Sequence, residues 1–381
     1  MSEAEVLVLA TLETKSEETA YLAARIEEHG VTARVIDISL ASEGGALDEG
    51  QKLEAINAIA SRTLSTIEAQ LDTTVHAVVG LGGGTGGEIA LRIMRALPIT
   101  FPKVLVTTLP FDPRFAVSDS SIVFVPTLID ICGLNATLRE VMENAAALTA
   151  GLCTTRRQAN ACVKDPSIAV TGLGATEGAV KRLTHALSAR GQETTAFHAN
   201  GFGGAAYVRF AERGAFNAVI DLTPHEVTRI HVAGAHVPMP KRFSVARDLP
   251  HIMLPGGVNF IGLGEKSLVP PEYLSRPHYA HSGYFTHVQL TPEEIAKVAT
   301  VLADSLNTVK GPAALVVPMG GFSHQDRPGG AIEDAGLRQV FLDQVSERLH
   351  NTVTLEVLSA DISAPETTQK ILELLEKFEA V

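Results

Sequence analysis

A glycine-rich stretch, residues 80–88 (GLGGGTGGE), contains the residue types that point most directly to chemistry. Six of its nine residues are glycine, an apolar run over 75–81 leads into it, and a helical pattern starts at Ile89. Glycine lets the backbone approach a phosphate closely, and a helix N-terminus presents free N–H groups and a partial positive charge. The stretch therefore predicts a phosphate-binding turn between a strand and a helix.

The same glycines leave other interpretations open. Gly82, Gly84 and Gly87 have the GxGxxG spacing of dinucleotide-binding proteins. In those proteins the motif follows the first strand and an acidic residue lies about twenty residues further on. Here the motif follows the third predicted strand, no acidic residue ends the fourth, and no Walker-type Gly-Lys-Ser/Thr is present. The remaining alternative is a tight turn without a ligand, although five glycines from 82 to 87 exceed what a turn needs.

Histidines and carboxylates in the second half of the chain could perform acid–base chemistry. Nine of the thirteen histidines lie from His198 to His324, but without HxH or HExxH pairs, so we predict no metal site. His198 ends a predicted strand beside a glycine-rich loop; Asp221 ends another strand, and Glu226 follows it. A histidine oriented by a carboxylate is a general acid–base pair. His324 is a further catalytic candidate, and the alternative is that these histidines are scattered core and surface residues.

Strand and helix patterns alternate along the whole chain. In the first half they predict strands over 6–10, 34–38, 75–81, 104–107 and 122–125, helices over 17–29, 51–71, 89–97 and 135–151, and a loop over 11–16. In the second half they predict strands over 168–171, 194–198, 218–221, 252–254 and 315–317, and helices over 179–189, 292–307, 334–349 and 365–378. Such alternation favours parallel strand pairing through right-handed crossovers. The predicted fold is α/β, with two Rossmann-like domains, each a mainly parallel sheet flanked by helices.

A short linker is predicted between the two domains. Residues 151–166 (GLCTTRRQANACVKDP) lack sustained periodicity and end in Asp-Pro, so we place the linker there. The predicted domains are 1–155, an N-terminal domain that binds a nucleotide or phosphate, and 165–381, a C-terminal domain with a candidate ligand or catalytic pocket. A glycine-rich break at Gly44-Gly45 is predicted before the second helix.

Composition and charge exclude several classes of protein. The 381 residues are too many for one ordinary core, and 45% hydrophobic with 19% charged residues is typical of globular domains. A net charge of −12 without a basic stripe argues against nucleic-acid binding. No apolar run is long enough to span a membrane, so we expect no membrane association. The acidic start is unlike a signal peptide and the three cysteines fit reduced thiols, so we expect a cytoplasmic protein.

Seven short motifs occur in the order found in a known protein family. They are ATLETK (10–15), GLGGGTG (80–86), IDICGLN (129–135), FHANG (197–201), DLT (221–223) and PGG at both 255–257 and 328–330. Together they resemble the family of the tomato mosaic virus resistance protein and its ATP-binding domain, over essentially the whole chain. The resemblance implies two α/β domains, a homodimer or larger homo-oligomer, and ATP binding by the first domain.

The resemblance also assigns binding residues in the first domain. It places a phosphate site at Gly82, Gly83, Gly84, Thr85 and Gly86, and it matches Thr11, Thr14 and Lys15 to the family's first loop. Lys15 either neutralises phosphate charge or is a solvated lysine before a helix. Thr107 and Thr108 end the fourth predicted strand, where their hydroxyls either bond a phosphate or ribose or cap local backbone.

Three functions are consistent with these residues. The first is an ATP-binding protein with a ligand cleft at the glycine-loop edges of its sheets; turnover is expected to be slow or absent, because Asp112, Asp119 and Asp130 give Mg²⁺ no clear site. The second is a metabolic enzyme, a lyase or hydrolase, which uses the second domain on a small carbonyl or carboxylate compound. In that case the first-domain loop holds the phosphate of a phosphorylated small molecule. The third is a regulatory or scaffold binder.

Overall fold

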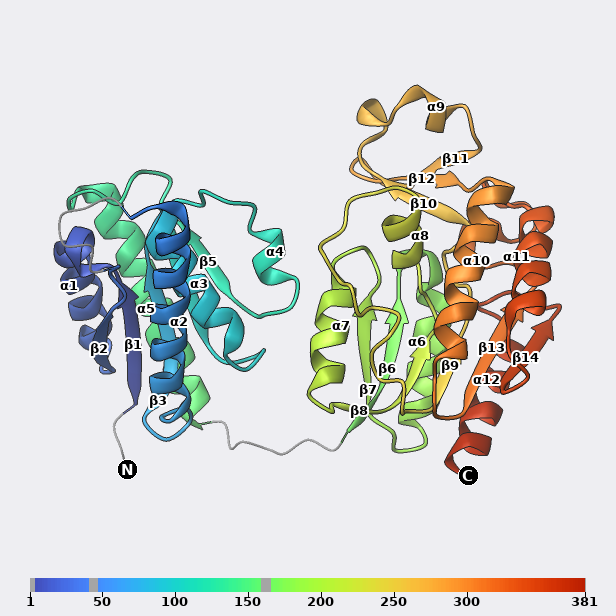
Figure 1. Cartoon of the computed structure of the whole chain (residues 1–381), viewed down its shortest axis with the longest axis horizontal. Helices are drawn as coiled ribbons and strands as arrows, with labels where there is room; N and C mark the ends of the chain where they lie inside the picture. Colours follow the sequence, from blue (N-terminus) through green and yellow to red (C-terminus); the bar gives the residue numbers. More distant parts are fainter. Residues whose placement is uncertain (1–3, 41–46, 159–165, 381) are drawn as a thin grey trace. The chain divides into compact units, whose positions relative to one another are not determined.

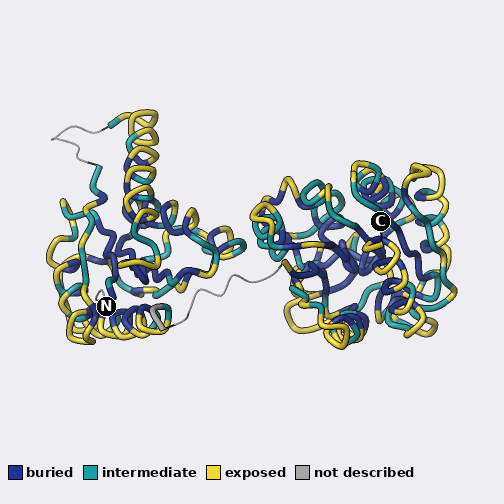
Figure 2. Tube along the Cα trace, turned by 90° about the horizontal axis from the view of Figure 1, so that it is seen from below, coloured by how far each residue is buried: buried dark blue, intermediate teal, exposed yellow. Residues whose placement is uncertain are grey.

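The chain forms two compact units, residues 1–163 and 164–381. A computed structural model describes residues 4–40, 47–158 and 166–380 (Figure 1). The predicted break at Gly44-Gly45, residues 159–165 of the predicted linker and Cys162 lie outside the described residues. In both units the sheet strands are largely buried, and the outer sides of the helices are exposed (Figure 2).

The first unit is built on a five-stranded sheet in the order β2-β1-β3-β4-β5, in which every pair is parallel. Its strands are β1 (Glu5–Ala10), β2 (Thr32–Asp37), β3 (Val75–Leu81), β4 (Lys103–Thr107) and β5 (Val123–Pro126). Its helices are α1 (Leu12–Glu28), α2 (Glu49–Glu68), α3 (Gly84–Ala96), α4 (Arg114–Val117) and α5 (Ala136–Gln158). Helices α1 and α5 pack on one face of the sheet, and α2 and α3 pack on the other.

The second unit is built on a six-stranded parallel sheet in the order β14-β13-β9-β8-β6-β7. Its strands are β6 (Ser167–Gly172), β7 (Thr194–His198), β8 (Phe216–Asp221), β9 (His251–Met253), β13 (Ala313–Pro318) and β14 (Val353–Leu358). A separate antiparallel sheet contains β10 (Phe260–Leu263), β12 (Thr286–Gln289) and β11 (His278–Ala280). This small sheet lies beyond α8 (Glu226–His231) at one end of the unit (Figure 1).

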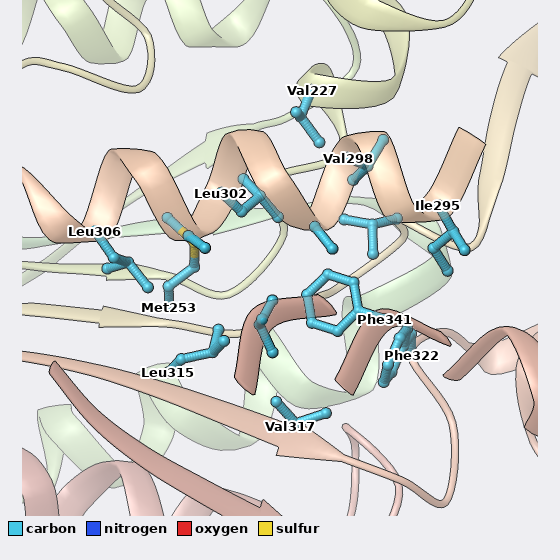
Figure 3. Close-up of a cluster of buried hydrophobic side chains, with 14 of the residues drawn as sticks. Val227, Met253, Ile295, Val298, Leu302, Leu306, Leu315, Val317, Phe322 and Phe341 are labelled. Carbon is cyan, nitrogen blue, oxygen red and sulfur yellow. The ribbon is translucent and has the colours of Figure 1, made fainter. Parts of the chain in front are cut away.

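Helices cover both faces of the large sheet in the second unit. They are α6 (Glu177–Ser188), α7 (Gly203–Glu212), α10 (Pro292–Asn307), α11 (Ala335–Arg348) and α12 (Pro365–Glu379). The short helix α9 (Pro271–Leu274) lies beyond the small antiparallel sheet instead (Figure 1). Short 3₁₀ turns are η1 (Gly174–Thr176), η2 (Lys266–Leu268) and η3 (His324–Asp326). Helices α6 and α12 pack on one face. Helices α10 and α11 pack on the other, where Leu302 and Phe341 lie against Met253, Leu315 and neighbouring side chains (Figure 3).

The alternation predicted from the sequence is confirmed as two mainly parallel α/β units. Several predicted boundaries differ from the structure; for example, α3 begins at Gly84 instead of Ile89. Two further differences concern the first loop and the linker. The predicted loop at 11–16 is the first turn of α1, which Lys15 interrupts with non-helical backbone angles, so the periodic pattern starts only after it. Helix α5 continues to Gln158, through half of the segment predicted as a linker. Among the described residues no helix is long and apolar enough to cross a membrane. Cys132 is exposed, whereas Cys153 is buried and its thiol donates to Glu5 O at 3.7 Å.

Candidate functional site

The candidate site of the first unit lies where the strand order of its sheet reverses, between β1 and β3. Strand β1 pairs with β2 on one side and with β3 on the other, and the helices that follow β1 and β3 cover opposite faces. Turns that leave two such strands in opposite directions open a crevice at the carboxyl edge of the sheet, where ligands bind. The two turns are in contact, since a Cβ on Gly86 would lie 3.2 Å from Thr11 Cγ2.

A cavity of about 390 Å³ occupies this edge of the sheet. Eight of the ten predicted binding residues line it, namely Thr11, Thr14, Lys15, Gly83, Gly84, Thr85, Gly86 and Thr108. The other two predicted residues are not among its lining. Gly82 belongs to the turn itself, and Thr107 is fully buried with its Oγ1 accepting a hydrogen bond from Leu109 N at 3.3 Å. Four more residues line the cavity, namely Glu13, Leu40, Lys52 and Asp130.

The glycines of the turn are required for different reasons. A Cβ on Gly82 would lie 2.7 Å from Gly87 N, and one on Gly80 would lie 2.8 Å from Ala90 Cβ, so these two permit the turn and the packing of α3 on β3. Gly84 differs, because a Cβ there would meet no atom within 4 Å and its φ is outside the left-handed region. Glycine is also a poorer helix former than alanine. The fold therefore does not require glycine at position 84, and the bare backbone leaves space in the cavity.

A matched pair of substitutions separates these roles. Gly82→Ala is expected to lower the free energy of unfolding of the first unit by about 1–3 kcal/mol, because the new methyl group would collide with backbone atoms of the turn. Gly84→Ala should leave that energy unchanged or raise it by about 0.4–1 kcal/mol. Urea unfolding followed by circular dichroism measures both values, and equal losses at the two positions would contradict the assignment.

Positive charge and hydrogen-bond donors gather at the cavity. The first turn of α3 contains Gly84, Thr85 and Gly86, has no acidic residue, and presents its N-terminal N–H groups at the edge that these residues line. Lys15 lines the same cavity and its Nζ donates to Ile131 O. Lys52 reaches it from α2. Backbone donors at a helix N-terminus together with lysine ammonium groups suit a phosphate.

Two carboxylates, Glu13 and Asp130, line the cavity and could hold a cation beside that phosphate site. Asp130 lines the cavity, with its Oδ1 accepting from Ile131 N at 2.8 Å. The other two aspartates considered for Mg²⁺ are held elsewhere, since Asp112 pairs with Arg114 at 2.5 Å and Asp119 pairs with Arg95 at 2.9 Å. A carboxylate together with phosphate oxygens is the ligand set that Mg²⁺ usually takes in nucleotide sites.

A second cavity, of about 620 Å³, adjoins the first at Gly84 and Thr85. Its walls include the apolar side chains of Leu91, Phe111 and Phe115, and Phe111 is held edge-on against Phe124 with ring centroids 6.3 Å apart. The exposed Phe115 ring is 46% accessible. A polar cavity suited to phosphate next to a more apolar cavity fits a ligand with a charged chain and a flat ring.

In the second unit, the predicted catalytic carboxylates form a buried ion-pair network. Arg242 donates to Asp221 at 2.8 and 3.0 Å and to Glu226 at 2.6 Å. Thr171 Oγ1 and Gly204 N also donate to these carboxylates. Asp221 is 3% exposed and Glu226 is fully buried, and the guanidinium holds the pKa of Asp221 below its usual range despite burial. The two carboxylates are thus bonded to Arg242 in place of the predicted pairing with His198.

The two predicted catalytic histidines lie near the surface. His198 ends β7 and lines a cavity of about 400 Å³ together with Gly172, Gly174 and Glu177. Partial burial lowers the pKa of His198, so the ring is neutral at pH 7. His324 lies exposed on η3, with its Nδ1 2.5 Å from Arg327 Nη2. His198 therefore lies at the end of a strand beside a cavity, the position predicted for a general base. His324 instead interacts with a neighbouring surface arginine.

Comparison with known proteins assigns the chain to a family. Two family models match it: the N-terminal domain of the uncharacterised protein family UPF0261 over residues 41–158, and the C-terminal domain of the same family over residues 165–378. The chain belongs to the UPF0261 family.

Bacterial UPF0261 proteins and a tomato protein are similar over most of this chain. A UPF0261 protein of Brucella suis is 28% identical over 404 residues, covering 98% of this chain and 96% of that protein. One from Rhizobium meliloti is 32% identical over 353 residues, covering 86% and 87%. The tomato ToMV resistance protein Tm-1(GCR237) is 29% identical over 312 residues, covering 79% of this chain and 41% of the tomato protein. The resemblance noted from the sequence motifs is confirmed.

A group of histidines in this UPF0261 chain was not predicted as a unit. The rings of His225, Phe260, His287 and His281 form a column, with successive centroids 4.6, 4.1 and 4.9 Å apart. The column runs from the fully buried His225 to the exposed His281. In the described residues no group of histidine, cysteine and acidic side chains is arranged to hold a metal ion. The pairing of β10, β12 and β11 brings Phe260, His287 and His281 together, and His225 joins them from the start of α8, so sequence spacing carried no signal for the group.

Proposed function

We propose that the first unit binds ATP in the cavity at the carboxyl edge of its sheet. The observation that carries this proposal is Gly84, whose missing side chain is required neither by packing nor by backbone conformation and whose backbone lines the cavity. The position of the cavity at the β1–β3 switch point supports it, because open parallel sheets bind ligands there. The resemblance of the seven sequence motifs, which implies ATP binding by the first domain, favours a nucleotide as the ligand.

Different parts of ATP would occupy the two adjoining cavities. The N–H groups at the start of α3 and the ammonium groups of Lys15 and Lys52 would hold the phosphates. The recess beside Phe111 and Phe115 would hold the base against apolar surface. A bound Mg²⁺ would supply charge neutralisation for the phosphates, with Asp130 as its protein ligand. Of the three aspartates considered for Mg²⁺ only Asp130 lines the cavity, which favours binding with slow or no hydrolysis.

Calorimetric titration with ATP, NAD and an acyl-CoA tests the proposal. Wild-type chain is expected to bind ATP in preference to the other two. Gly84→Val should weaken ATP binding at least about 100-fold, because the added side chain fills space next to the helix N-terminus. Gly151→Val is the matched control, since this exposed helical glycine in α5 also has no atom within 4 Å of its added Cβ.

Two results would overturn the proposal. One is the absence of ATP binding by the folded wild-type chain, which would leave a phosphorylated small molecule as the alternative ligand of the loop. The other is undiminished ATP binding by Gly84→Val, which would place the nucleotide elsewhere. A cytoplasmic homodimer or larger homo-oligomer is part of the same proposal, supported by the family resemblance, and light scattering of the purified chain tests the assembly.

A further inference from the structure

Arg229 on α8 is packed between glycines from three different segments of the second unit. A Cβ on Gly201 would lie 2.7 Å from its Cδ, one on Gly234 would lie 3.4 Å from its Cγ, and one on Gly262 would lie 2.6 Å from its Nη2. Gly201 and Gly234 have φ of 97° and 120°, which favours glycine in any case. The φ of Gly262 lies outside the left-handed region, so backbone conformation does not require glycine there. A side chain at this position would collide with the Arg229 guanidinium, which explains the glycine.

The charge of Arg229 has no counter-charge bonded to it. The side chain is 8% exposed, its Nη1 donates to Ala235 O at 2.8 Å, and its Nε has no hydrogen-bond partner. No carboxylate of the described residues forms an ion pair with it, and both oxygens of nearby Glu226 are bonded to Arg242 and Gly204. Other buried arginines are paired, as Arg338 is with Asp326 at 2.7 Å. Glu226 attracts the guanidinium without bonding to it, and the unsatisfied Nε leaves a hydrogen bond that an anionic ligand would accept.

His225 provides a hydrogen-bond acceptor next to this cation. Its Nδ1 lies 2.7 Å from Gly257 O, so Nδ1 carries the proton and donates, and Nε2 has a free lone pair. Nε2 is buried without a partner and lies 3.4 Å from the position of a Cβ on Gly262, the same position that is 2.6 Å from Arg229 Nη2. Burial and the nearby guanidinium keep the pKa of His225 well below its usual value, so the ring is neutral at pH 7.

The place of this pair in the fold is one where a ligand is expected. His225 and Arg229 follow β8, and the β6–β8 boundary is the switch point of the six-stranded sheet. The buried apolar side chains of Phe260 and Ile332 lie beside them, and His287 adds another buried nitrogen, Nδ1, without a partner. One permanent cation, one neutral acceptor and apolar walls match a small organic monoanion better than a phosphate dianion.

We propose that Arg229 and His225 bind a small 2-hydroxycarboxylate in the second unit. The carboxylate pairs with the guanidinium, and the adjacent hydroxyl donates to His225 Nε2. This site is separate from the glycine-loop cavity of the first unit and is independent of ATP binding there. Because His225 is fully buried, entry requires the small sheet of β10, β12 and β11 to move, and association is slower than in an open pocket.

Titration of the full chain with glycolate, acetate and inorganic phosphate tests this site. Glycolate and acetate differ by the one hydroxyl group, so the wild type should bind glycolate about 10-fold more tightly through the bond to His225. His225→Phe keeps an aromatic ring next to Phe260 and should remove only that 10-fold preference. Arg229→Met should abolish binding of both acids. Arg348→Met, which removes an exposed cation paired with Asp304, is the matched control and should change neither.

The melting temperature of the ligand-free variants separates ligand binding from a structural role. Because no carboxylate is bonded to Arg229, Arg229→Met should leave the melting temperature unchanged or raise it, whereas loss of a residue that holds the fold would lower it. Equal wild-type affinity for glycolate and acetate would overturn the proposal. So would tighter binding of phosphate, binding unaffected by Arg229→Met, a large loss of melting temperature in that variant, or no binding of any probe.

Discussion

Arg242→Met is expected to destabilise the second unit by about 3–5 kcal/mol, the usual loss when one partner of a buried ion pair is removed. The substitution leaves the carboxylates of Asp221 and Glu226, 3% and 0% exposed, without the guanidinium that neutralises them. Methionine fills similar volume, so the loss reflects charge more than packing. Hydrogen exchange of peptides covering β8 and α8, in full-length wild type and variant, reports the effect within this unit.

The pH dependence of the variant distinguishes charge from packing. Without Arg242, burial raises the pKa of Asp221 in the folded state, so the folded state binds a proton more tightly than the unfolded state. Part of the lost stability should therefore return as the pH falls from 7 towards 5. The triple substitution Arg242→Met, Asp221→Asn, Glu226→Gln should also recover part of it. Arg348→Met, which breaks an exposed pair with Asp304, should cost no more than about 1 kcal/mol. A similarly small loss at Arg242 would refute the assignment.

The parallel framework of both units was predictable from local sequence signals. Val75–Leu81, Thr194–His198 and Pro292–Asn307 were predicted to the residue. The helix at Pro292 begins with a capping box between Thr291 and Glu294, which a sequence displays directly. The small antiparallel sheet was not predicted, because β10, β11 and β12 have only three or four residues each. Strands this short show no measurable period and form through pairing with one another.

The positions of the candidate sites were predictable from the sequence, but the partners of their charged side chains were not. Polar residues and glycines at the ends of parallel strands mark the ligand edge of a sheet, and this placed Lys15, Gly84 and Thr108 correctly at one cavity. The same reasoning brought Asp221 to the right edge of the second sheet. It could not find Arg242, which reaches that carboxylate from the irregular segment between α8 and β9. A side chain's partner across such a segment depends on tertiary packing, which periodicity does not report.

Acid is expected to destabilise the second unit through two buried histidines. Burial lowers the pKa of His251 to about 4 and that of His287 to about 3, from 6.5 when unfolded. Both side chains are 7% exposed. Below pH 6.5 these two histidines bind protons in the unfolded chain but not in the folded chain, so the free energy of unfolding falls as the pH falls. This loss stops growing only below the folded pKa values. At pH 5 each histidine should cost about 2 kcal/mol.

One carboxyl group acts in the opposite direction and sets the net size of this effect. Burial raises the pKa of Asp326 to about 6, so the folded state gains a proton first and recovers about 1.4 kcal/mol by pH 5. For these three groups the net loss between pH 7 and pH 5 is then about 2.5 kcal/mol, and the fully buried His225, whose pKa is also lowered, adds to the loss. Urea unfolding of the full chain at the two pH values measures it, with hydrogen exchange at β9 and β12 as the local readout. His287→Gln should remove about 2 kcal/mol of the loss, while the exposed His324→Gln should remove none. Unchanged or greater stability at pH 5 would show that these rings are protonated in the folded chain.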